Sequence, residues 1–77
     1  MKEESLFYKE CYRMAIEKGI YTDAEIADKT GLTRVTIGNL RYKKGAPTRK
    51  TLIKLGLLFG KSYDDMVELY NASLTTE

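Results

Sequence analysis

Apolar residues recur every three or four positions through most of the chain, which is the spacing of helices that bury one face. No segment shows the strict alternation of apolar and polar residues expected of a half-buried strand. The pattern therefore predicts an all-α fold, with one domain over 1–77 and a short flexible tail at about 72–77. The five predicted helices span residues 5–18, 23–30, 33–42, 48–59 and 62–70.

The ends of these helices carry residues that favour helix starts and stops. Thr22 and Glu25 form a Thr-x-x-Glu capping box, and Gly31 stands just past the same helix, where a positive φ costs glycine nothing. Asp64 and Asp65 fall in the first turn of the last helix, where the helix dipole favours them. The other expected N-caps are Ser5, Thr33 and Thr48. The expected apolar faces contain Leu6, Tyr8, Cys11, Tyr12, Ala15, Ile16, Ile26, Ala27, Ile37, Leu40, Leu52, Leu55, Leu58, Phe59, Tyr63, Met66, Val67 and Tyr70.

Charge is divided unevenly along the chain, although the 77 residues carry a net charge of only +2. Residues 1–28 contain four basic and seven acidic side chains, and residues 64–77 contain four acidic and no basic ones. The 35 residues between them, 29–63, contain nine basic side chains and no acidic one. A positive face on a nearly neutral molecule attracts a polyanion, so the pattern favours nucleic acid over a merely solvated surface.

Composition excludes several functional classes. The chain has no histidine and one cysteine, Cys11, which excludes a histidine-based catalytic site, a Cys/His zinc site and an internal disulfide. We expect Cys11 to be a small buried hydrophobe, and we expect no enzyme activity, no cofactor and no metal. No apolar run approaches the roughly 20 residues of a membrane helix. These features predict a cytoplasmic protein without a membrane partner, associated with the nucleoid when bound to DNA.

Two short helices that meet at a glycine-containing turn are typical of a helix-turn-helix, here over about 22–41. Ala27 is small enough for the two helices to cross closely, and Ile37 and Leu40 are expected to anchor the second helix from beneath. The remaining positions of that helix carry no acid and include several small side chains. Such a surface suits a helix that is pressed into the major groove of DNA.

Residues 22–37, with the sequence TDAEIADKTGLTRVTI, resemble the helix-turn-helix of the Cro/CI (XRE-type, lambda-repressor-like) phage and bacterial repressors. Pro47, Thr48 and the leucines at 52, 55 and 58, followed by 60–66, resemble the fourth and fifth helices of that family. The resemblance covers about residues 5–70. It implies a compact five-helix domain that binds double-stranded DNA as a transcriptional regulator, usually as a homodimer on a pseudo-palindromic operator.

The resemblance also implies roles for individual residues. Arg34, Val35, Gly38 and Asn39 match base-reading positions, and we expect Arg34 to contact guanine O6 and N7 and Val35 to contact a thymine methyl. Asn39 is expected either to read an adenine or to bond only phosphate or water. The expected phosphate contacts are Thr22, Thr33, Thr36, Lys43, Lys44 and Arg49.

Three positions depart from the family's pattern. Asp23 stands where many relatives have a glutamine that bonds phosphate and braces the recognition helix, and a carboxylate cannot donate that bond. Arg41 stands where a glutamate is frequent, which adds charge and removes an expected partner. Gly45 comes two residues later than the usual loop glycine.

Two kinds of protein partner remain open at this point. Helical spacing alone makes Val67, Tyr70 and Leu74 candidate dimer contacts, and a separate regulatory protein is a second candidate partner. The alternative function is a protein-binding adaptor or anti-repressor that keeps this scaffold without specific DNA binding, and RNA binding is a variant of the leading hypothesis. Asp23 favours the adaptor, and so do the aromatic residues of the first helix, Phe7, Tyr8 and Tyr12.

Overall fold

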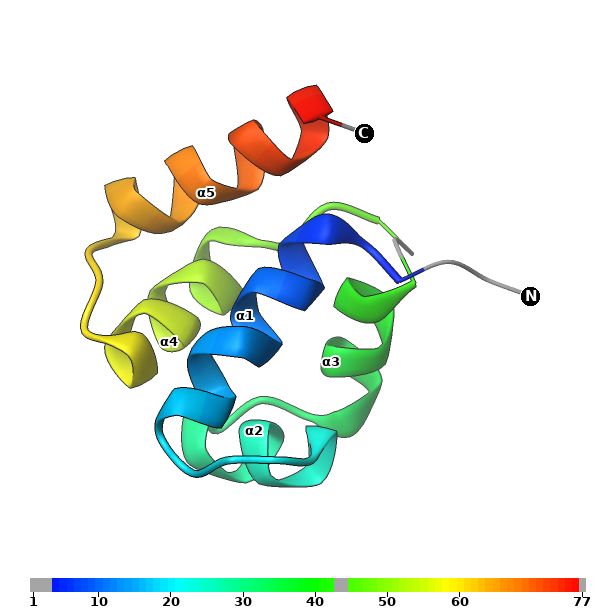
Figure 1. Ribbon diagram of the computed structural model, residues 1–77, viewed down its shortest axis with the longest axis vertical. Coiled ribbons are helices and arrows are strands. Elements are labelled where there is room, and N and C mark those ends of the chain that lie inside the picture. Colours follow the sequence, from blue (N-terminus) through cyan, green and yellow to red (C-terminus); the bar gives the residue numbers. More distant parts are fainter. Residues whose placement is uncertain (1–3, 43–44, 77) are drawn as a thin grey trace.

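Five α-helices and no strand form in residues 4–42 and 45–76, which the computed structural model describes, with side chains through residue 74 (Figure 1). The predicted all-α fold with five helices is confirmed. The helices are α1 (Leu6–Glu17), α2 (Asp23–Thr30), α3 (Arg34–Arg41), α4 (Arg49–Phe59) and α5 (Tyr63–Thr76).

The helix α5 lies across one end of the molecule, against α1 and α4, and α2 lies at the other end (Figure 1). Between them α3 packs on α1 and α2, and α2 also contacts α4. The pair α2 and α3 is therefore supported from two sides, by α1 and by α4. None of the helices traced in the described ranges combines the length and the hydropathy that a bilayer crossing requires.

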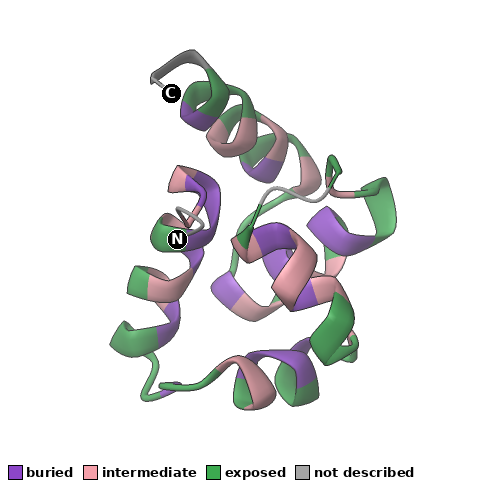
Figure 2. Cartoon of the chain, turned by 90° about the vertical axis from the view of Figure 1, so that its right-hand side faces the viewer, coloured by how far each residue is buried: buried purple, intermediate pink, exposed green. Residues whose placement is uncertain are grey.

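The core lies where the buried faces of the helices meet (Figure 2). Most residues of the expected apolar faces are buried, but Ile16 is exposed. The expected residues that are only half-buried are Leu6, Tyr12, Leu58, Tyr63, Val67 and Tyr70. Phe7 was not expected in the core, yet α5 covers it, with the Tyr70 ring packed edge-on at a centroid distance of 5.3 Å. The buried apolar residues are Phe7, Tyr8, Cys11, Ala15, Ile20, Ile26, Ala27, Ile37, Leu40, Leu52, Leu55, Phe59 and Met66.

The expected N-caps are confirmed by their hydrogen bonds. The Thr22 hydroxyl accepts from the amide of Glu25 at 3.1 Å, and the Thr33 hydroxyl accepts from the amide of Thr36 at 3.1 Å. Gly31 has a φ of 76°, the left-handed conformation that lets the chain leave α2 and enter α3 within a short turn. The same kind of cap starts α1 and α4 at Ser5 and Thr48.

The last helix is longer than predicted. Its expected end near Asn71 is wrong, because α5 continues to Thr76. Ser73 is buried in this final part, and its hydroxyl donates to the carbonyl of Leu69 at 2.9 Å. The polar side chain of Ser73 therefore has a hydrogen-bond partner within the helix, although a polar residue there suggested a frayed tail.

The turn between α4 and α5 packs directly on Gly56. The Lys61 amide donates to the Gly56 carbonyl at 2.8 Å. A Cβ at position 56 would lie 2.5 Å from the Lys61 carbonyl oxygen and 3.2 Å from Cγ of Met66. Only glycine permits this approach, so position 56 sets how closely α5 packs against α4.

Candidate nucleic-acid interface

The turn between α2 and α3 is held from both sides. The Thr30 hydroxyl donates to the Ile26 carbonyl at 2.7 Å and accepts from the Leu32 amide at 3.3 Å. From α4, the Lys54 ammonium donates to the Gly31 carbonyl at 3.4 Å. These bonds fix α2 and α3 relative to each other across a tight turn, which is the arrangement of a helix-turn-helix.

The outward face of α3 carries three of the predicted base-reading residues. Ile37 and Leu40 are buried as expected, which leaves Arg34 exposed and Val35 73% exposed on the other side. At Gly38 an added Cβ would meet no atom within 4 Å, so packing inside the protein does not require a glycine there. This face therefore offers a guanidinium, an apolar side chain and an open space with no carboxylate.

An open groove of about 460 Å³ lies between α3 and the start of α4. Thr33, Thr36 and Asn39 line its α3 side, and Lys50 and Lys54 line its α4 side. The two lysines are four residues apart, which places them on one face of α4. A groove that carries two ammonium groups beside α3 suits contact with an anionic backbone.

The predicted phosphate contacts fall into different surroundings. Thr22 and Thr33 are exposed at the starts of α2 and α3, where their hydroxyls already cap the helices. The Thr33 hydroxyl also lies 3.0 Å from that of Thr36. Arg49 lies elsewhere, since its guanidinium is placed over the Tyr63 ring, 5.2 Å from the centroid. The other two predicted phosphate contacts, Lys43 and Lys44, lie outside the described residues.

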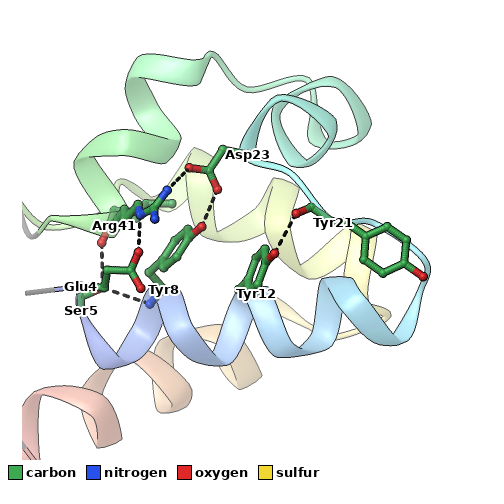
Figure 3. Close-up of polar contacts among 8 residues, drawn as sticks. Glu4, Ser5, Tyr8, Tyr12, Tyr21, Asp23 and Arg41 are labelled. Carbon is green, nitrogen blue, oxygen red and sulfur yellow. Dashed lines mark hydrogen bonds and ion pairs between the residues drawn. The ribbon is translucent and has the colours of Figure 1, made fainter.

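Two of the departures from the family's pattern are bonded to each other (Figure 3). Nη1 of Arg41 lies 3.0 Å from Oδ2 of Asp23, and Nε of Arg41 bonds the carboxylate of Glu4. The Tyr8 hydroxyl donates to the other carboxylate oxygen of Asp23. Although no glutamate stands at position 41, Arg41 takes part in ion pairs of its own, with the carboxylates of Glu4 and Asp23.

The surroundings of Arg41 keep it charged. Partial burial lowers the pKa of its guanidinium, but hydrogen bonds to Glu4 and Asp23 outweigh this, and the pKa is raised above its ordinary value. The guanidinium also lies over the rings of Tyr8 and Tyr42, at 5.3 and 5.4 Å from the centroids. Burial, and then the hydrogen bond to Asp23, raise the pKa of Tyr8, so its phenol keeps the proton that it donates.

The three candidate dimer contacts differ in exposure. Val67 and Tyr70 are half-buried and pack against the core, whereas Leu74 is 52% exposed. Tyr70 is already engaged with Phe7. Leu74 is therefore the residue of the three whose side chain is most available for contact with a second molecule.

Within the described residues, two short helices are fixed across a tight turn, and the second presents an acid-free face beside a lysine-lined groove. This fold and surface define a DNA-binding helix-turn-helix domain. The chain belongs to the Helix-turn-helix family of the Cro/CI (XRE) type, whose family model matches residues 13–66. Members of this family are DNA-binding regulatory domains rather than enzymes. No curated protein and no solved structure matches the chain.

Proposed function

We propose that this protein is a sequence-specific regulator of transcription, a Cro/CI-like repressor of phage, prophage or bacterial origin. It binds double-stranded DNA with residues 33–41 in the major groove. The observation that carries the proposal is the outward face of α3, where Arg34 and Val35 project from a helix whose opposite side is anchored by buried Ile37 and Leu40. A rigidly held helix start with free side chains is what base readout needs.

Each of four residues on α3 has its own role in base readout. Arg34 offers two parallel donors to guanine O6 and N7, and Val35 gains burial when it contacts a thymine methyl. Because Gly38 has no side chain, the backbone of α3 can approach the wall of the DNA major groove closely at this position. Asn39 lies at the edge of the groove between α3 and α4, where it reads an adenine or bonds the backbone.

Phosphate contacts surround this helix and supply most of the affinity. The starts of α2 and α3, at Thr22, Thr33 and Thr36, offer hydroxyls together with the positive end of a helix dipole. The basic side chains assigned to the backbone are Lys43, Lys44 and Arg49. The acidic segments on either side of 29–63 favour one orientation of the protein on a polyanion.

A dimer follows from the symmetry of duplex recognition. Two copies joined through Val67, Tyr70 and Leu74 would present two α3 helices to half-sites roughly 34–36 Å apart on a pseudo-palindromic operator. Occupation of such an operator in the cytoplasm represses a promoter that overlaps it. A separate regulatory protein is the second partner that we propose.

The alternative function, a protein-binding adaptor or anti-repressor, has lost one of its two supports. Phe7 and Tyr8 are buried, at 3% and 5% exposure, and Tyr12 is half-buried, so the three do not form an exposed aromatic docking surface. Asp23 at the start of α2 still favours it, because a carboxylate cannot donate a hydrogen bond to phosphate. We therefore retain it as the function to which a negative DNA-binding result would lead.

Binding to a pool of random duplexes across a salt series tests the proposed function. Sequencing of the retained DNA should give one inverted-repeat motif, with affinity that falls steeply as salt rises. Retention without a motif would leave only non-specific DNA binding. The absence of retention at low salt would contradict the proposal and favour the protein-binding alternative.

A further inference from the structure

The carboxyl end of α3 is tied to two other helix starts by a cluster of polar contacts (Figure 3). Ser5 donates twice, from its amide to the Arg41 carbonyl at 2.8 Å and from its hydroxyl to the Leu40 carbonyl at 2.7 Å. Both of these carbonyls belong to the last turn of α3, where carbonyl groups have no hydrogen-bond donor within the helix. The start of α1 thus caps the end of the candidate recognition helix.

The side chain of Arg41 adds a second set of ties. One part of the guanidinium bonds Glu4, just before α1, and another bonds Asp23, the first residue of α2. Tyr8 from α1 holds the second oxygen of Asp23. One arginine therefore links α3 with the starts of both α1 and α2.

These contacts have the form of a positioning device. The side chains of Glu4, Asp23 and Arg41 are each only about one third exposed, at 31%, 28% and 35%, so solvent screens them less than a surface pair. The planar guanidinium of Arg41 bridges two carboxylates through Nε and Nη1, and this fixed geometry restrains both partners. Because Arg41 is the last residue of α3, these ion pairs restrain the end of that helix relative to the starts of α1 and α2.

We propose that Glu4, Tyr8, Asp23 and Arg41 form a clamp that sets the tilt of α3 for base readout, with Arg41 as the positioning residue. This inference rests on the proposed function and adds a specificity determinant that touches no base. Since two carboxylates already neutralise its charge, Arg41 is not a phosphate contact. Loss of the clamp should therefore lower the preference for the operator over random DNA and leave the electrostatic part of binding in place.

The test uses the operator obtained by selection and a random duplex of equal length. For the wild type and Arg41→Gln, affinity for both duplexes is measured across a salt series, well below the melting temperature of either protein. We expect the ratio of operator to random affinity to fall about tenfold in the variant, with an unchanged salt slope on random DNA. A second variant, Tyr8→Phe, removes only the hydroxyl that holds Asp23 and should lower the same ratio by a smaller factor.

A matched control is present on the outer face of α1. Arg13 also bonds two carboxylates, those of Glu10 and Glu17 at 2.8 and 3.2 Å, but it lies on the exposed surface away from the clamp. Arg13→Gln should leave the ratio and the salt slope unchanged. In a double-mutant cycle, Asp23→Asn with Arg41→Gln should lower the ratio no further than the larger single effect.

Several results would overturn the clamp. An unchanged ratio in folded Arg41→Gln, or in Tyr8→Phe if Arg41→Gln does not fold, would leave these residues with a role in stability alone. An equal loss on both duplexes, with a salt slope shallower by about one, would make Arg41 a phosphate contact. If the wild type itself selects no motif, the proposed function fails, and the clamp's part in base readout fails with it.

Discussion

Val35 illustrates how one residue links the fold to a function. It stands in the first turn of α3 with 73% of its surface exposed, next to an exposed Arg34. In the free protein this apolar side chain gains nothing from burial, whereas contact with a thymine methyl would cover it. The neighbouring arginine supplies the polar half of the same recognition surface.

Gly38 lies one turn further along this face and offers a clean test of close contact with DNA. Gly38→Ala should raise the free energy of unfolding by about 0.5–1 kcal/mol, because an added Cβ meets no atom within 4 Å and alanine favours the helix. The same methyl group should weaken operator binding by about 1–3 kcal/mol, because it would clash with the wall of the DNA major groove. Urea denaturation and fluorescence anisotropy measure the two effects, and a stabilised variant with unchanged affinity would contradict close contact at Gly38.

Cys11 gives a prediction that concerns the fold alone. The thiol is 4% exposed, and burial raises its pKa to about 12. An unfolded thiol ionises near pH 8.5 while the folded one stays protonated, so unfolding releases a proton and stability falls as the pH rises between these values.

Removal of the thiol should remove this dependence. Between about pH 8 and pH 10 the free energy of unfolding of the wild type should fall by roughly 2 kcal/mol more than that of Cys11→Ala. Denaturation of both proteins at the two pH values measures the difference, in which the other titrating groups cancel. Parallel declines would show that the thiol ionises equally well in the folded protein.

At the scale of elements, the helices were predictable because their signals are local. Thr22, Thr33 and Thr48 each accept from an amide three residues later, so a short window of sequence contains both donor and acceptor. The continuation of α5 was not predictable in this way, because Ser73 is polar in sequence and buried only through tertiary packing.

The site could be predicted only where a residue acts alone. The exposed face of α3 follows from helical spacing once Ile37 and Leu40 are assigned to the core. The bond between Asp23 and Arg41 joins residues 18 positions apart, and no local rule connects them. The sequence offered one signal for this pair: the two residues carry opposite charges, and both stand at positions that depart from the family's pattern.

Gly56 allows the packing of two elements to be tested with the same substitution as Gly38. Gly56→Ala should lower the free energy of unfolding by about 1–3 kcal/mol, because its Cβ would lie 2.5 Å from the Lys61 carbonyl oxygen and force α5 away from α4. Urea denaturation beside Gly38→Ala gives the comparison. If both substitutions raised the free energy of unfolding, the turn after α4 would be able to move away from the added Cβ without loss of stability.

For the whole molecule, the proposed dimer contact at Leu74 can be tested. Leu74→Asp should abolish dimerisation and weaken operator binding, while the free energy of unfolding changes by no more than about 0.5 kcal/mol, because Leu74 is 52% exposed. Sedimentation equilibrium and denaturation measure both. Leu57→Asp, on the exposed face of α4 at 78% exposure, is the matched control. A dimer that survives Leu74→Asp would place the contact elsewhere.

The direct test of base readout by α3 is the specificity of Arg34→Ala. Affinity is measured for the operator, for each of its single-base-pair variants and for a random duplex at one salt concentration. The variant should lose about 1–3 kcal/mol on the operator and become indifferent to one base pair in each half-site, while the other positions keep their penalties. An equal loss on operator and random DNA, with every base preference intact, would make Arg34 a phosphate contact and contradict base readout by this residue.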